Sequence, residues 1–150
     1  MAHEIERKYL VDKSLWEKVI KDKAEYVHQL YLHADTQKAI RVRIIGKKAF
    51  ITIKSKLSDI KRLEFEYEIP LEDAKLMMEA YADCPQVEKT RYFIKEEHHT
   101  WEIDVFHGKN EGLIVAEIEL SHEDELFALP HWVAEEVTHD PTYLNVNLAK

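Results

Sequence analysis

Apolar and polar residues alternate along most of this chain. Segments with a period of two are typical of β-strands that have one face in an apolar core and the other against a polar environment. Short glycine-containing stretches separate some of them, as hairpin loops do. The pattern predicts an antiparallel sheet of eight strands, at 5–11, 28–32, 39–45, 49–56, 62–69, 88–94, 100–106 and 113–120.

Helical spacing of apolar residues, or a capping residue before an acidic stretch, fills the gaps between these segments. Such caps are Ser, Asp or Asn side chains that accept hydrogen bonds from the first turn. The predicted helices are 12–20, capped by Asp12 or Ser14, then 70–84, then 121–129, capped by Ser121, and lastly 141–148, capped by Asp140. We expect Trp16, Trp101 and Trp132 to pack between sheet and helices.

Charges of one sign tend to run along the polar face of each strand, acid with acid and base with base. For any single strand, a solvated outer face is the simplest interpretation. A solvated surface, however, favours interspersed signs, and exposed ion pairs contribute only about 0 to 1 kcal/mol. Blocks of one sign on almost every strand are better explained if the charged faces meet one another across an enclosed space.

A closed barrel provides that geometry, because each strand sends alternate residues into the lumen. The sequence therefore predicts an α+β fold in which a closed antiparallel eight-stranded β-barrel has helices packed on its outside, with residues 1–150 forming one domain. Its charged face looks inward. The basic set comprises Lys8, Arg41, Arg43, Lys54, Lys89 and Arg91, and the acidic set Glu4, Glu6, Glu64, Glu66, Asp104, Glu117 and Glu119, with Glu102 and Lys56 less clearly assigned.

Two such charged walls indicate a ligand that satisfies both. Clustered Arg and Lys bind phosphate oxygens, and carboxylates bind Mg²⁺ or Mn²⁺, which also bridge phosphates. A short polyphosphate carrying metal ions meets both requirements. The chain has only 3 glycines and no glycine-rich phosphate loop, so side chains would have to hold the phosphates.

Composition narrows the class further. A net charge of −8 disfavours nucleic acid, because nucleic-acid affinity depends on clustered positive charge. The apolar runs are too short to cross a bilayer, there is no signal-peptide pattern, and the single cysteine, Cys84, cannot form a disulfide within the chain. We expect a cytoplasmic protein without nucleic-acid or membrane partners. Its oligomeric state is not indicated.

The chain resembles the CYTH superfamily, the triphosphate tunnel metalloenzymes. Its first strand matches the family's ExExK signature, and seven further segments follow in family order over essentially the whole chain. The matching segments are EIERK (4–8), RVR (41–43), TIKS (52–55), RLEFEYEI (62–69), VEKTRY (87–92), EIDVF (102–106), AEIEL (116–120) and EEVTHDPTYLN (135–145).

The resemblance implies an eight-stranded tunnel that binds triphosphates with Mg²⁺ or Mn²⁺, most similar to the short bacterial inorganic triphosphatases. We expect the basic set to hold tripolyphosphate and the acidic set to hold metal while tripolyphosphate is hydrolysed to pyrophosphate and phosphate. Glu4, Glu6 and Lys8 are the expected catalytic residues, with Glu4 or Glu6 orienting the attacking water. Asp104 has two possible roles, as a metal ligand or as a partner of a lumen arginine. The alternatives are a thiamine-triphosphatase, a class IV adenylyl cyclase or a non-catalytic polyphosphate-binding module.

Overall fold

The computed structural model describes residues 3–150, in which nine strands form one sheet. The strands are β1 (His3–Val11), β2 (Ala24–Ala34), β3 (Lys38–Ile45), β4 (Lys48–Lys56), β5 (Lys61–Ile69), β6 (Gln86–Glu96), β7 (His99–Phe106), β8 (Ile114–Glu119) and β9 (Val133–Glu136). The helices are α1 (Lys13–Trp16), α2 (Leu71–Ala80) and α3 (Asn145–Ala149), with 3₁₀ turns η1 (Gly108–Asn110) and η2 (Pro141–Tyr143). All eight predicted strands are confirmed, and β9 is additional.

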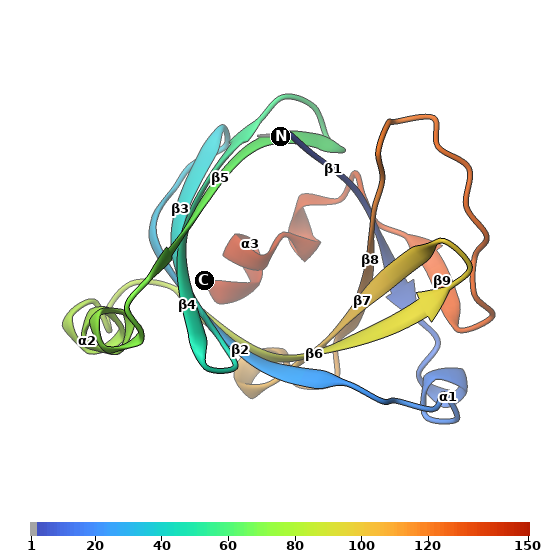
Figure 1. The fold of residues 1–150 in the computed structure, drawn as a ribbon, viewed down its shortest axis with the longest axis horizontal. Coiled ribbons are helices and arrows are strands. Elements are labelled where there is room, and N and C mark those ends of the chain that lie inside the picture. The colour runs from blue at the N-terminus through green and yellow to red at the C-terminus, as the bar shows by residue number, and fades with distance from the viewer. Residues whose placement is uncertain (1–2) are drawn as a thin grey trace.

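The sheet closes on itself. Its strand order is β5-β4-β3-β2-β6-β7-β8-β1, and β1 then pairs with β5, so eight antiparallel strands form a barrel (Figure 1). Closure leaves β9 as an extra strand beside β1. The predicted eight-stranded closed barrel is therefore confirmed.

The first strand lies at the seam of the barrel and has three neighbours. Residues 3–5 of β1 pair with β5, residues 6–10 pair with β8, and β9 lies against the end of β1 at Tyr9 and Val11. The backbone of Glu6 donates a hydrogen bond to the carbonyl of Ile60, and Val137 donates to the carbonyl of Lys8. The strand that carries the predicted signature is thus fixed along both of its edges.

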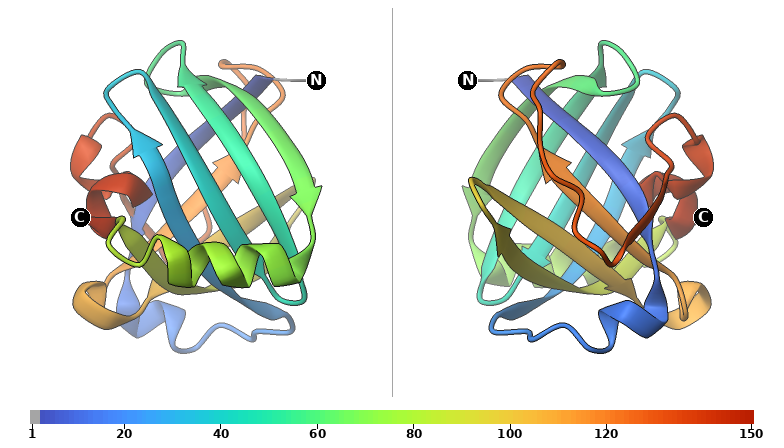
Figure 2. Two further views of the ribbon diagram at one scale, coloured as in Figure 1. Left: turned by 90° about the vertical axis from the view of Figure 1, so that its left-hand side faces the viewer. Right: turned by 90° about the vertical axis from the view of Figure 1, so that its right-hand side faces the viewer.

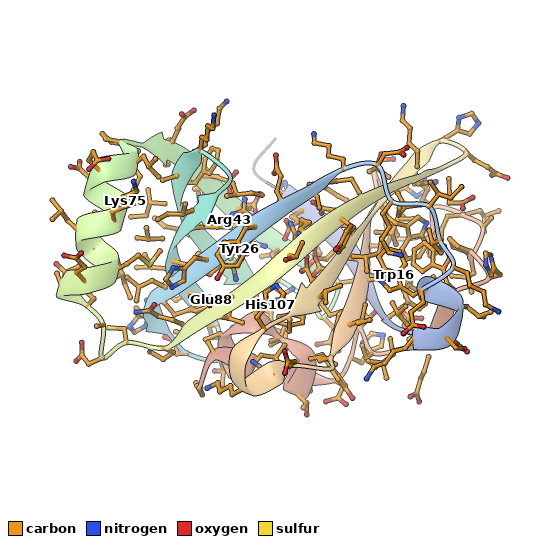
Figure 3. The ribbon with its side chains drawn as sticks, turned by 90° about the horizontal axis from the view of Figure 1, so that it is seen from below. Trp16, Tyr26, Arg43, Lys75, Glu88 and His107 are labelled. Carbon is orange, nitrogen blue, oxygen red and sulfur yellow. The ribbon has the colours of Figure 1, made fainter. Side chains whose placement is uncertain are left out.

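An aromatic cluster forms the largest packed region outside the barrel wall. Trp101 of β7 lies edge-on to Trp132 with ring centroids 5.8 Å apart, and Trp132 meets Trp16 of α1 at 5.5 Å. All three rings are buried. Figure 2 shows the segment between β8 and β9 running over β1, and Figure 3 shows Trp16 beside α1. The expected packing of these tryptophans outside the barrel is confirmed.

The predicted helices are shorter than expected, and one is absent. Helix α2 lies across the outer face of the strands (Figure 2) and buries Ala74 against Leu30 and Val42. The helix predicted at 121–129 was wrong, since the structure has no helix there. The Glu125 carboxylate bonds both the backbone amide and the hydroxyl of Ser121, which closes a turn in place of a helix cap. Among residues 3–150, no helix is long and apolar enough to cross a membrane.

The C-terminal segment differs from the other helical elements in its position. Figure 1, which looks along the barrel, shows α3 behind the ring of strands and across its far end. The side of α3 with Val146 and Ala149 packs against Tyr31, Val87 and Phe106. The predicted single helix over 141–148 is divided into η2 and α3. Apolar side chains of the C-terminal segment therefore pack into one end of the barrel.

Candidate functional site in the barrel lumen

The lumen holds a cavity of about 510 Å³. The strand period of two brings one side chain in every pair to this space. Every predicted site residue except Asp104 lines it, and the less clearly assigned Glu102 and Lys56 line it too. Asp104 lies in the same network but is completely buried behind the basic residues. The inward orientation of the charged faces, on which the sequence interpretation depended, is therefore confirmed.

Strand register places several opposite charges directly across from one another. Lys54 faces Glu64, with the ammonium 3.3 Å from the carboxylate, and it also contacts Glu4 at 2.9 Å. Lys8 faces Glu117, with 3.6 Å between the charged atoms. Cross-strand pairs of opposite charge stabilise a sheet, and buried charges require such partners. These pairs keep the ionised lumen compatible with the fold.

On the side of the lumen formed by β6 and β7, the charged side chains are hydrogen-bonded to one another in one network. Asp104 accepts hydrogen bonds from Lys89 at 2.7 Å and from Nε and Nη2 of Arg91 at 2.8 and 2.9 Å. Glu102 accepts from the remaining Nη1 of Arg91 at 3.0 Å. Burial, followed by the nearby Arg91, lowers the pKa of Lys89 to about 7 despite the attraction of Asp104. Asp104 thus fixes both cations, which is one of the two roles expected for it.

The two arginines of β3 are less completely paired. Within residues 3–150, the Nε atoms of Arg41 and Arg43 are buried and have no hydrogen-bond partner. Arg43 donates to Glu66 at 3.2 Å, and burial together with Arg41 lowers its pKa to about 10. An unpaired buried guanidinium N–H is costly, so these groups are poised to bind an acceptor. Phosphate oxygens are acceptors that match the guanidinium geometry.

The acidic side contains like charges that face one another. Register sets Glu6 opposite Glu119 on β1 and β8, and Glu102 opposite Glu117 on β7 and β8. Burial, followed by the charge of Glu117, raises the pKa of Glu6 to about 8. Burial also raises the pKa of Glu117, but Lys8 and Arg91 outweigh that effect and hold it well below its ordinary value. Glu6 is therefore a carboxyl group of this wall that holds its proton to an unusually high pH and that a bound cation would help to ionise.

Some uncharged residues in or beside the lumen were not assigned to the site, because the assignment followed charge. Gln29 is completely buried beneath Tyr31, and Thr52 donates to Glu66 at 2.9 Å. Asn145 reaches the lumen from the C-terminal segment and accepts a hydrogen bond from Lys89. Register could have indicated Gln29 and Thr52, since they pair with Arg43 and Arg41 on β3. No signal in the strand pattern points to Asn145.

Comparison with known proteins agrees with this geometry. Residues 2–148 match the profile of the CYTH domain. An inorganic triphosphatase of Acetivibrio thermocellus is 43% identical over 150 residues, covering 100% of this chain and 95% of the relative. One from Nitrosomonas europaea is 36% identical over 154 residues, covering 97% and 96%. A crystal structure of an inorganic triphosphatase superposes with a TM-score of 0.69 at 35% identity, covering 99% of this chain and 95% of that one.

Proposed function

This chain belongs to the CYTH domain family, and on that premise we propose that it is an inorganic triphosphatase, a metal-dependent hydrolase that cleaves tripolyphosphate to pyrophosphate and phosphate. One observation carries the proposal. The buried Nε atoms of Arg41 and Arg43 are without acceptors in a charged cavity of about 510 Å³. A triphosphate supplies acceptors of the right charge and geometry.

The basic residues would hold the phosphate chain and offset negative charge on the phosphoryl group as it is transferred. Phosphoryl transfer depends on such positioning and electrostatic stabilisation more than on covalent chemistry from the protein. Arg41 and Arg43 on β3 are the first contacts we assign. Lys8, Lys54, Lys89 and Arg91 complete the set, and their carboxylate partners keep them oriented before substrate arrives.

The acidic residues fit a hard divalent cation in their donor chemistry. Glu6 and Glu119 are directly opposed carboxylates, and the raised pKa of Glu6 reflects burial without a full countercharge. Among residues 3–150 no three such side chains are already arranged as a metal cluster, so they would have to converge on the ion. We propose that Mg²⁺ or Mn²⁺ is held from among Glu4, Glu6, Glu64, Glu66, Glu117 and Glu119, which line the cavity. Asp104, also expected among the metal ligands, is completely buried and bonded by Lys89 and Arg91, so we propose that it holds these two cations instead. The bound ion supplies Lewis-acid neutralisation of phosphate charge.

Glu4 and Glu6 keep the proposed role of orienting the attacking water. Burial alone would raise the pKa of Glu4, but the charge of Lys54 and hydrogen bonds from Lys54 and Glu64 lower it. This carboxylate is therefore charged and can accept a hydrogen bond from water. Lys8 completes the proposed catalytic set because its ammonium lies beside Glu117 in the same wall.

The composition of the cavity favours inorganic triphosphate over the alternatives. Among the described lining residues, the one Phe, Tyr or Trp side chain is Tyr31, and it is buried, with 5% of its surface exposed. A nucleobase or thiamine ring binds best stacked against an aromatic side chain. The complete acidic wall equally disfavours a non-catalytic polyphosphate-binding module, since binding phosphate alone does not require it. We place the enzyme in the cytoplasm, consistent with its unpaired Cys84.

The test is phosphate release from tripolyphosphate, ATP and thiamine triphosphate, each with Mg²⁺, with Mn²⁺ and with chelator. We expect kcat/KM to be highest for tripolyphosphate and turnover to disappear with chelator. Preference for ATP with formation of a cyclic nucleotide, or for thiamine triphosphate, would select the corresponding alternative. Binding of tripolyphosphate without turnover under any of these conditions would select the binding module.

A further inference from the structure

The C-terminal segment supplies hydrogen-bond acceptors to two lysines of the lumen. The side-chain oxygen of Asn145, the first residue of α3, accepts from Nζ of Lys89 at 2.8 Å. The backbone oxygen of Tyr143 accepts from Nζ of Lys8 at 3.3 Å. Both lysines belong to the basic set that the strands bring together. A part of the chain outside the barrel wall therefore contributes to the arrangement of the site.

The burial of Lys89 limits the hydrogen-bond partners of its ammonium group, and Asn145 is one of them. Lys89 has 1% of its surface exposed, and its ammonium has three donor hydrogens. Asp104 takes one of these and Asn145 takes another, which directs the third. Gln29, completely buried, also donates to the Asn145 oxygen at 3.4 Å, so the carboxamide itself is held. A buried ammonium that lost one acceptor would have to rotate or recruit water.

We propose that Asn145 is a positioning residue for the reaction, which aligns Lys89 with the phosphate chain through its side-chain oxygen. This inference rests on the proposed triphosphatase function. It assigns to α3 a part in the chemistry besides that of filling one end of the barrel. Because the same carboxamide contacts Lys89 and Gln29, the seating of α3 and the direction of the Lys89 ammonium are linked.

A purely structural role of Asn145 would be to fasten α3, and the chain has separate bonds for that purpose. The side-chain amide of Asn110 donates to the Leu148 carbonyl at 2.8 Å, and Lys109 donates to the Ala149 carbonyl at 2.8 Å. Both bonds join the turn η1 to the end of α3. Asn110→Ala therefore removes a carboxamide that holds the same helix while leaving the contacts of Lys89 intact, which makes it a matched control.

The experiment is a double-mutant cycle of Asn145→Ala and Lys89→Met, with Asn110→Ala beside it. Each protein is measured for kcat and KM with tripolyphosphate, for tripolyphosphate affinity without metal by calorimetry, and for denaturant unfolding. We expect Asn145→Ala to lower kcat/KM about 10- to 100-fold, as loss of a supporting hydrogen bond does at other sites. The double variant should be no worse than Lys89→Met alone, because residues that act as a unit are non-additive. Asn110→Ala should stay within about twofold of the parent protein.

Equal losses in Asn145→Ala and Asn110→Ala, or losses that multiply in the double variant, would overturn the inference. If Asn145→Ala does not fold, Asn145→Ser replaces it in the same cycle under the same criteria. An inactive parent protein would refute the proposed function. In that event the calorimetric cycle still decides the inference, since coupling of Asn145 and Lys89 in tripolyphosphate binding supports it and independent effects refute it.

Discussion

The two charged walls of the lumen differ in how their charges are balanced. On the β6–β7 side, Lys89 and Arg91 share the carboxylate of Asp104 through hydrogen bonds of 2.7 to 2.9 Å. On the β1–β8 side, register opposes Glu6 to Glu119, and the pKa of Glu6 rises to about 8 because of burial and then of Glu117. The cations of the β6–β7 side are paired internally, whereas the β1–β8 side retains opposed carboxyl groups that a cation would balance.

This difference explains why one fold can hold both walls. A barrel in which every charge was paired internally would have no affinity left for a charged ligand, and one with none paired would not fold. Here internal pairs hold several of the cations, whereas within residues 3–150 the Nε atoms of Arg41 and Arg43 have no hydrogen-bond partner, and these are the groups that we propose to bind phosphate. Binding energy is thereby available where the chemistry needs it.

The largest expected effect comes from the acidic side. Glu6→Gln should lower metal-dependent kcat on tripolyphosphate by about 10²- to 10³-fold, because it removes a charge that directly balances the ion or orients water. Glu4→Gln should do the same. Steady-state kinetics at saturating Mg²⁺ measures both. Glu68→Gln, a carboxylate of the same alternating pattern outside the cavity lining, is the control; equal activity in all three variants would contradict the role of Glu4 and Glu6.

Disrupting the basic side should instead lower the free energy of unfolding. Asp104→Asn leaves Lys89 and Arg91 with a neutral partner in a buried setting, and loss of one member of a buried ion pair costs about 3 to 5 kcal/mol. Urea unfolding measures this loss. Glu102→Gln is the control, since its side chain is 32% exposed and bonds only one nitrogen of Arg91. Similar unfolding midpoints for Asp104→Asn and Glu102→Gln would contradict the role of Asp104 as the shared partner of Lys89 and Arg91.

The acidic side should also give metal-free protein a specific pH dependence. The pKa of Glu6 is about 8 in the fold and near its ordinary 4.5 when unfolded, so the folded state binds its proton more tightly. Its contribution to the free energy of unfolding is complete below pH 4.5 and is lost as pH rises toward 8. In chelator, the difference in stability between parent and Glu6→Gln should therefore shift across that window. A difference independent of pH would contradict the raised pKa.

The smallest effect is expected outside the barrel. Arg7 lies between Glu6 and Lys8 in the sequence but points outward, where it bonds Glu136 at 2.8 Å with both side chains partly exposed. Arg7→Gln should change stability by less than about 1 kcal/mol and leave kcat unaltered, as expected for a surface ion pair. Urea unfolding and the kinetic assay check both. A large kinetic loss would mean that the outer face also contributes to the site.

Alternation in the sequence was sufficient for the strands and for the direction of their charged faces, because a period of two leaves only two faces to choose between. It was insufficient at the barrel ends. The prediction of a helix at 121–129 was wrong, and the Glu125 carboxylate there accepts hydrogen bonds from Ser121 within a turn. The lumen position of Asn145 depends on how α3 packs against Tyr31 and Phe106, which is set by tertiary structure alone. Neutral lumen residues such as Gln29 could be found only by register.

The seam at β1 has a consequence for synthesis of the chain. Strand β1 pairs with β5, β8 and β9, so β8 and β9, its last neighbours, are synthesised only after β2 to β7. Hairpins such as β3–β4 can form during elongation, but the ring cannot shut until β8 has been synthesised. Glu6 and Lys8 therefore lack their partners on β8 until then, and a product terminated before β8 would carry the signature without an enclosed channel.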